Sequence, residues 1–173
     1  MRLLTLFCIL SSTVFATTAP NFQGETMTGA KINLKDQLKP NRVLLVSFWA
    51  SWCTPCLEEI EHVKEHLAKE PTLPLDVITV NVDTSETQTD VKPTVRLHKI
   101  TFPVILDPKH EILSKYQQTG TIPFSVLIGP KGTIESTFNG FSETMFDKIK
   151  SVVAQRGVAE GPAKETNAKD KSK

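Results

Sequence analysis

Cysteine is scarce in this chain, which has three cysteines in 173 residues. Cys8 falls in the apolar N-terminal segment, so only Cys53 and Cys56 remain in the rest of the chain. A domain of this size can build its core without disulfides. A bridge across the two-residue gap between Cys53 and Cys56 closes too small a loop to stabilise the chain much by entropy. These counts exclude a disulfide framework.

An excess of charge of one sign is also lacking. The chain has 20 Lys and Arg against 19 Asp and Glu, which gives a formal net charge of +1. The two signs are mixed along the chain, without the basic stripe typical of nucleic-acid binding. We therefore expect no nucleic-acid partner, and the charge gives no argument for an acidic substrate.

Long hydrophobic runs are absent except near the N-terminus. Met1 and Arg2 precede the nearly all-apolar segment Leu3–Leu10, and Val14–Ala16 offers the small residues of a cleavage site. This apolar segment is shorter than the about 20 residues that span a membrane. We predict a signal peptide over residues 1–16 and an exported, periplasmic or extracytoplasmic protein. An uncleaved membrane anchor is the alternative, because no charge occurs between Arg2 and Glu25.

Hydrophobic patterns predict alternating strands and helices. Val43–Trp49 is a continuous apolar run of strand length, typical of a central strand buried on both faces. Apolar residues spaced by three and four predict a helix from about Cys53 to Lys69, and Leu75–Val82 predicts a second strand. Strand, helix and strand form a βαβ unit with parallel strands.

The segments around this unit complete an α/β fold. We expect a central mixed sheet flanked by helices, with an N-terminal hairpin and an inserted strand and helix, in one domain over residues 20–156. Residues 157–173 are poor in apolar residues and predict a disordered tail. The other predicted elements are a hairpin (21–33), a helical turn (34–38), helices (93–100, 112–116, 144–155) and strands (104–106, 124–128, 133–138).

The cysteine pair has the position of a reactive centre. Cys53 is expected at a helix N-terminus, where free N–H groups and the helix dipole stabilise a thiolate. A free thiol titrates near pH ~8.5, and this setting can lower its pKa to about 7 or below. Cys53 would attack, and Cys56, one turn further on, would resolve the mixed disulfide. Pro55 suits the first helical turn.

A metal site is the alternative use of the two cysteines. A structural zinc site needs about two more ligands, and His62 and His66 are the nearest candidates. His62 lies six residues after Cys56, about 240° around the helix. We therefore expect no metal and no other cofactor, and we interpret the two histidines as part of a solvated helix face.

The segment Val46–Cys56 (VSFWASWCTPC) resembles the active-site segment of the thioredoxin superfamily. Gly120–Ile128 (GTIPFSVLI) resembles the loop of that family that carries a cis-proline before a strand. The export signal, the early hairpin and the inserted strand and helix are similar to the extracytoplasmic TlpA/ResA-like branch. The resemblance covers roughly residues 20–156 and implies a thioredoxin fold and thiol–disulfide oxidoreductase activity.

The resemblance also implies roles for individual residues. Cys53 matches the nucleophile and Cys56 the resolving cysteine, so the two form the redox disulfide. Pro123 matches the cis-proline, and the backbone of Ile122 before it is expected to pair with an extended substrate segment. Trp52 matches the aromatic residue that flanks the nucleophile, with simple packing as the alternative. Substrates would be proteins with disulfides.

Two positions depart from the common pattern. Ser47 stands where many thioredoxins carry a buried Asp that serves the resolving thiol. Glu59, three residues after Cys56, shares a helix face with it, and it matches a glutamate of ResA-like proteins. We expect Glu59 to tune the thiol pKa values or relay a proton, or else to be one more glutamate in an acidic first turn of the helix. Phe124 replaces a frequent Thr and argues against carrying over a specific substrate.

The sequence therefore predicts an exported thiol–disulfide oxidoreductase, and the resemblance to the TlpA/ResA-like branch implies that it reduces protein disulfides. The resemblance implies a role in cytochrome c maturation, with a membrane thiol carrier restoring the dithiol. A protein disulfide oxidase or isomerase is one alternative, and a copper- or metal-binding module that uses the cysteine pair is another. No Pro-x-x-x-Thr-x-x-Cys pattern leads to Cys53, which disfavours a peroxidase.

Overall fold

A five-stranded mixed sheet forms the centre of the molecule, in a computed structural model that describes residues 17–156. The strand order is β5-β4-β3-β6-β7. The strands are β3 (Val43–Trp49), β4 (Leu75–Asn81), β5 (Val104–Leu106), β6 (Phe124–Ile128) and β7 (Ile134–Asn139). β3, β4 and β5 are parallel, whereas β6 and β7 continue the sheet antiparallel. The predicted mixed sheet is confirmed.

The remaining elements follow the predicted order. β1 (Gln23–Glu25) and β2 (Lys31–Asn33) form the expected antiparallel hairpin. The helices are α1 (Leu34–Gln37), α2 (Thr54–Lys69), α3 (Val91–Leu97) and α4 (Met145–Gln155), with 3-10 helices η1 (Gln88–Asp90) and η2 (Leu113–Lys115). The predicted signal peptide and the predicted disordered tail lie outside the described residues.

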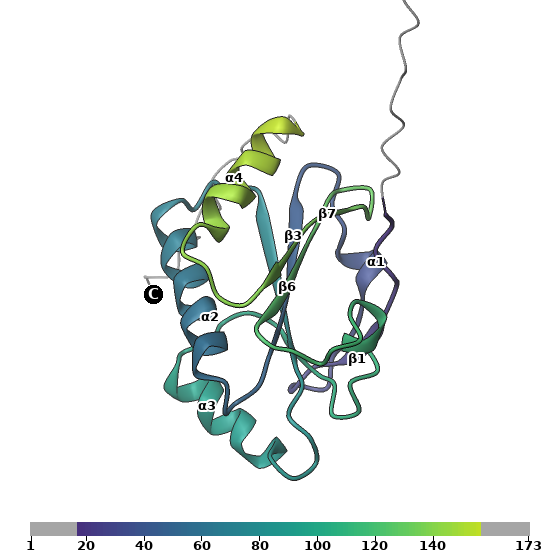
Figure 1. The fold of residues 1–173 in the computed structure, drawn as a ribbon, viewed down its shortest axis with the longest axis vertical. Helices are drawn as coiled ribbons and strands as arrows, with labels where there is room; N and C mark the ends of the chain where they lie inside the picture. Colours follow the sequence, from purple (N-terminus) through teal and green to yellow (C-terminus); the bar gives the residue numbers. More distant parts are fainter. Residues whose placement is uncertain (1–16, 157–173) are drawn as a thin grey trace, which may run out of the picture.

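The helices and the hairpin cover opposite faces of the sheet (Figure 1). α2 and α4 lie together on one face, with α3 on the same side, and α1 lies with β1 on the other. This arrangement follows from the βαβ unit, because a right-handed crossover places α2 on one face of the parallel strands. The N-terminal end of α2 is thereby brought to the edge of the sheet where β3 ends.

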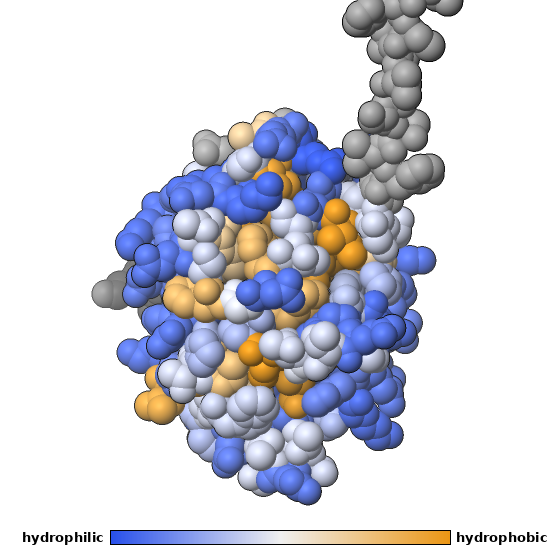
Figure 2. Space-filling model, viewed as in Figure 1, coloured by the Kyte–Doolittle hydropathy of each residue, from blue (hydrophilic) through white to orange (hydrophobic). Residues whose placement is uncertain are grey.

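The middle strand β3 is the centre of the core. Every residue from Val43 to Trp49 is buried, as expected for a strand covered on both faces. Leu45 contributes to the core under α4, with Phe146 and Ile149, and Phe48 contributes to the core on the hairpin side. The face in Figure 2 is hydrophilic at its margin, with hydrophobic residues gathered over the middle, where β6 and β7 lie.

Two predictions need correction in detail. The helix expected over residues 93–100 begins earlier and ends earlier, at Val91–Leu97. The solvated face expected for His62 and His66 is wrong, because α4 packs over it. The ring of His66 stacks on Phe146, with ring centroids 4.2 Å apart, and both histidines are half-buried.

Candidate active site

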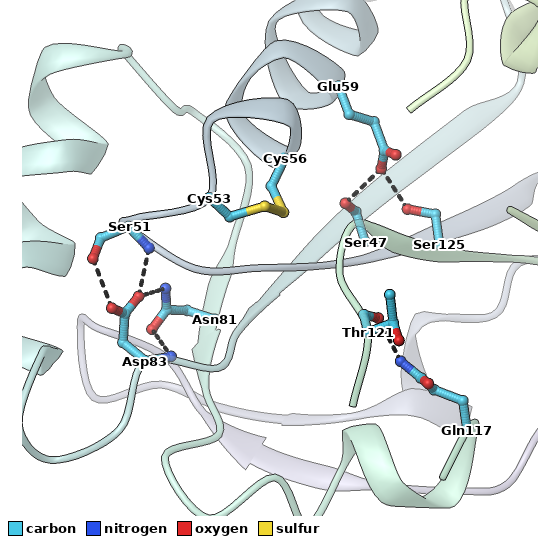
Figure 3. The surroundings of a disulfide bond; sticks show 10 residues. All are labelled: Ser47, Ser51, Cys53, Cys56, Glu59, Asn81, Asp83, Gln117, Thr121 and Ser125. Carbon is cyan, nitrogen blue, oxygen red and sulfur yellow. Dashed lines mark hydrogen bonds between the residues drawn. A yellow bond between two sulfur atoms is a disulfide. The ribbon is translucent and has the colours of Figure 1, made fainter. Parts of the chain in front are cut away.

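Cys53 and Cys56 lie at the start of α2 and form a disulfide, with their Sγ atoms 2.04 Å apart (Figure 3). Cys53 is the N-cap residue of the helix, and Pro55 lies in the first turn, where a missing N–H costs nothing. Cys53 is 5% exposed and Cys56 is 1% exposed. The first cysteine is therefore the more accessible of the two, as the sequence predicted.

Glu59 is fully buried one turn beyond Cys56. Its Oε1 atom accepts hydrogen bonds from Ser47 Oγ at 2.9 Å and from Ser125 Oγ at 2.6 Å. These serines face each other across the β3–β6 pair, and Figure 3 shows both hydroxyl groups directed at the carboxyl group. Oε2 is buried and has no hydrogen-bond partner among the described residues. Glu59 is thus a buried acid, and the alternative that it is one more glutamate in an acidic first turn is wrong.

Burial raises the pKa of Glu59 above its usual value of 4.5. The hydrogen bonds from Ser125 and Ser47 oppose this shift, because they stabilise the carboxylate, but they do not cancel it. The unpartnered Oε2 fits the same direction, since a charged carboxylate would leave one oxygen desolvated without a donor. This carboxyl group can hold a proton at a pH where an exposed glutamate has lost it.

The loop before β6 carries Gln117 and Thr121, which Figure 3 draws among the surroundings of the disulfide. The Ile122–Pro123 peptide bond is cis, as predicted. Among residues 17–156, neither backbone group of Ile122 makes a hydrogen bond. Gln117 holds the loop from one side, because its Nε2 donates to the carbonyl oxygen of Thr121 at 2.6 Å (Figure 3).

The aromatic residues of the site face in opposite directions. Trp52 is 64% exposed, so it is not a core residue and the alternative of simple packing does not hold. Phe124, which follows the cis-proline, is buried and packs against Phe48 with ring centroids 5.8 Å apart. The bulky side chain at position 124 therefore points into the core.

Sequence reasoning missed two groups of residues in this site. Ser125 was not singled out, although it pairs with Ser47 across the sheet. Asp83 was not singled out either, but it is buried and accepts hydrogen bonds from Ser51 (Figure 3). A polar residue directly after a parallel strand is a usual signal of a site, because ligands and active centres gather at that edge.

The site offers a cysteine pair and the buried acids Glu59 and Asp83 for chemistry. Between residues 17 and 156 there is no group of three or more His, Cys, Asp or Glu side chains placed to hold a metal ion. No helix in that part of the chain is long and apolar enough to cross a membrane. Two cysteines separated by two residues, as here, can exchange their disulfide with another dithiol.

Comparison with known proteins agrees with this geometry. The model of the AhpC/TSA family matches residues 15–137. The chain is 32% identical to sporulation thiol-disulfide oxidoreductase A of Bacillus subtilis over 117 residues, which cover 67% of this chain and 68% of that protein. It is 28% identical to thiol-disulfide oxidoreductase ResA of Bacillus subtilis over 164 residues, which cover 87% and 89% of the two chains.

A solved structure has the same fold. The crystal structure of StoA from Bacillus subtilis superposes with a TM-score of 0.62 at 29% identity, covering 78% of this chain and 98% of that one. Fold and cysteine pair together define a thiol–disulfide oxidoreductase with a thioredoxin fold. The chain belongs to the AhpC/TSA family, and within it the protein is similar to the ResA and StoA oxidoreductases.

Proposed function

We propose that this protein is an exported reductase of protein disulfides, in which Cys53 and Cys56 are the catalytic cysteines. The observation that carries the proposal is the Cys53–Cys56 disulfide at the N-terminus of α2, with Cys53 the more exposed cysteine. Free N–H groups of the first helical turn and the helix dipole favour a thiolate at that position. In the reduced protein the more accessible thiol is then the attacking group and the less accessible one is the resolving thiol.

The exchange proceeds in two displacements. The Cys53 thiolate attacks one sulfur of a substrate disulfide, forms a mixed disulfide and expels the other substrate sulfur as a thiolate, which takes up a proton. Cys56 loses its proton and attacks the Cys53 sulfur, which forms the Cys53–Cys56 disulfide and releases the second substrate thiolate. The substrate gains two electrons and the enzyme loses two.

Glu59 is proposed as the group that exchanges a proton with Cys56. It lies one turn away on the same helix and is buried. Burial raises its pKa from the usual value toward neutral pH, which favours a role as proton carrier, because a general base or acid works best when its pKa is close to the working pH. Ser47 and Ser125 both bond Oε1, which leaves Oε2 to hold the proton.

Substrate recognition is proposed at Trp52, Ile122 and Pro123. Trp52 offers a large exposed ring next to the attacking cysteine. The unpaired backbone groups of Ile122 are available to an extended peptide, which would add to the loop as a short strand. Such a contact consists of hydrogen bonds to the main chain of the substrate, so it does not depend on the substrate's side chains and suits proteins of varied sequence.

The reducing direction, the site of action and the pathway are the finer parts of the proposal. The resemblance to the TlpA/ResA-like branch supports the reduction of cysteines before haem attachment in cytochrome c maturation. The pattern of residues 1–16 supports export, with membrane attachment only through an uncleaved N-terminus. A membrane thiol carrier would return two electrons to the Cys53–Cys56 disulfide after each turnover.

Trapping of mixed disulfides tests the proposal. In cells, Cys56→Ala should accumulate covalent complexes with substrate proteins, because the resolving thiol is missing, and mass spectrometry of these complexes identifies the substrates. Cys53→Ala should trap nothing and lose exchange activity. Equal trapping by the two variants would contradict the assigned roles. Stoichiometric retention of Cu(I) without exchange would support the metal-binding alternative.

A further inference from the structure

Asp83 is a buried acid that the proposed exchange does not use. It lies two residues after the end of β4 and is 0% exposed. Its Oδ2 atom accepts hydrogen bonds from the backbone N–H of Ser51 and from Nδ2 of Asn81, each at 2.7 Å. Its Oδ1 atom accepts from the hydroxyl group of Ser51 at 2.6 Å. Both carboxylate oxygens therefore accept hydrogen bonds, Oδ2 from two donors and Oδ1 from one.

The charge of Asp83 has no cationic partner in the described part of the chain. None of the ion pairs there includes Asp83, and its three donors are neutral groups. Neutral donors hold the carboxylate in place but do not cancel its field. A buried charge acts over several ångströms with little screening.

This carboxylate is fixed to the segment that carries Cys53. Ser51 lies two residues before Cys53, in the turn closed by a bond from Cys53 N–H to the carbonyl of Ala50. Ser51 supplies two of the three hydrogen bonds to Asp83. In Figure 3 Asp83 and Ser51 lie on the Cys53 side of the disulfide, whereas Glu59 lies on the Cys56 side.

We propose that Asp83 is a positioning residue for Cys53. It fixes the turn between β3 and α2, and its buried negative charge disfavours the Cys53 thiolate. The inference rests on the proposed function, in which Cys53 is the attacking thiol. The helix N-terminus and Asp83 act in opposite directions on the same sulfur.

The expected consequence is a more reducing couple. A dithiol whose thiolate is strongly stabilised is a strong oxidant in its disulfide form, because the reduced state is favoured. Asp83 removes part of that stabilisation, so the disulfide is relatively more stable and the dithiol gives up its electrons more readily. This is the direction that a reductase requires.

Other ionisable groups around the disulfide must stay constant in a test. Glu58 and Glu59 lie on α2, Glu86 lies in the loop after β4, and His110 contacts the carbonyl oxygen of Val82 with its Nε2 at 2.9 Å. The loop segment 117–125 has no ionisable side chain. A substitution of Asp83 alone leaves all of these in place.

The pH dependence of Cys53 alkylation tests the charge. In the full chain with Cys56→Ser, the rate of reaction with iodoacetamide is measured against pH, and mass spectrometry separates the Cys53 peptide from Cys8. Asp83→Asn should move the midpoint to lower pH. Below the midpoint, alkylation should be roughly three- to tenfold faster, because the substitution removes a buried charge that is bonded to the backbone and side chain of Ser51, two residues before Cys53.

Asp76→Asn is the matched control. Asp76 lies at the other end of β4, where it pairs with Lys39 and Arg42, and the substitution removes the same charge. It should leave the midpoint unchanged, and Asp83→Glu, which keeps the charge, should move it less than Asp83→Asn does. If Asp83→Asn does not fold, Asp83→Ser removes the same charge and should give the same shift.

The inference would be overturned if the alkylation midpoint of Asp83→Asn equals that of Asp76→Asn. Where Asp83→Asn does not fold, the same comparison is made with Asp83→Ser. In the protein with both cysteines, Asp83→Asn should also shift the equilibrium with glutathione toward the dithiol by up to about tenfold, or about 30 mV. If Cys53 of the Cys56→Ser protein with native Asp83 forms no mixed disulfide and reacts like an ordinary thiol, the proposed function fails and this inference fails with it. If Cys53 is reactive but its alkylation midpoint does not depend on the charge at position 83, this inference fails and the proposed function stands.

Discussion

Glu59 and its two serines are the residues in which burial and hydrogen bonding compete most directly. Burial raises the pKa of the carboxyl group, and Ser125 and Ser47 lower it by donating to Oε1. The balance leaves an acid whose pKa in the folded protein is above that in the unfolded chain. The folded state therefore favours the protonated form of Glu59. The resulting contribution to the free energy of unfolding is fully present below the usual pKa of 4.5 and is lost as pH rises through the folded-state pKa.

Glu59→Gln should remove this pH dependence. A glutamine has nearly the same shape and accepts the same two hydrogen bonds, but it does not ionise. We expect the free energy of unfolding of the oxidised wild-type protein to fall between pH 4.5 and the folded-state pKa relative to that of the variant. Denaturant unfolding at a series of pH values measures this difference. Parallel pH profiles of the two proteins would contradict the account of Glu59.

Ser125 should lower the pKa of Glu59 more than Ser47 does. Ser125 makes the shorter bond to Oε1 and has the larger lowering effect on the pKa. Ser125→Ala should therefore raise the pKa of Glu59 more than Ser47→Ala does, and both should raise it above the wild-type value. Carbon NMR titration of the Glu59 carboxyl group measures the three values, and a decrease in either variant would contradict this prediction.

The sequence allowed the cysteines and the cis-proline to be predicted, because both occur in short segments with local signals. It did not allow the environment of Glu59 to be predicted. Ser47 and Ser125 lie on β3 and β6, and only the pairing of these strands brings their hydroxyl groups to one oxygen of Glu59. A contact made by three elements that are distant in the sequence has no local pattern.

At the scale of elements, α2 connects the site to the core. Its N-terminal end carries the disulfide, and its later turns pack under α4, where Val63 and Phe146 are buried together. The chemistry and the packing therefore occur at separate parts of one helix. A change in the packing of α4 should alter stability without altering the cysteines.

Phe146→Ala should destabilise the fold by about 3–5 kcal/mol, the usual cost of removing a large buried ring. The Phe146 side chain is 1% exposed, so its loss leaves a cavity between α2 and α4. Leu97→Ala is the control, because Leu97 is 78% exposed, and its effect should stay within about 0.5 kcal/mol. Denaturant unfolding measures both, and similar effects of the two variants would contradict the assigned core.

Strands with continuous apolar runs were predicted with correct ends, whereas short helices were not. Val43–Trp49 and Phe124–Ile128 are bounded by residues that cannot extend a buried strand, and the structure has the same bounds. α3 begins at Val91, ahead of the predicted start at Pro93, because the buried Val91 side chain anchors its first turn in the core. His66 was misjudged for a similar reason, since its partner Phe146 is on α4.

At the scale of the whole molecule, the proposal requires that the domain acts outside the cytoplasm. A cleaved signal peptide would leave a mature chain that begins at Thr17. Expression of the full chain in an exporting bacterial host, followed by mass spectrometry of the protein from the periplasm, should find that N-terminus. A membrane-bound protein that retains residues 1–16 would instead establish the anchored alternative, and protein confined to the cytoplasm would contradict export.

The direction of electron flow is the central claim about the molecule as a whole, and the reduction potential of the Cys53–Cys56 couple tests it most directly. The potential is measured by equilibrating the protein with glutathione or dithiothreitol mixtures and quantifying the dithiol. A reductase of protein disulfides should have a potential more negative than about −200 mV, toward the thioredoxin value of about −270 mV. A potential between about −180 and −120 mV, the range of disulfide isomerases and strong oxidants, would contradict the account.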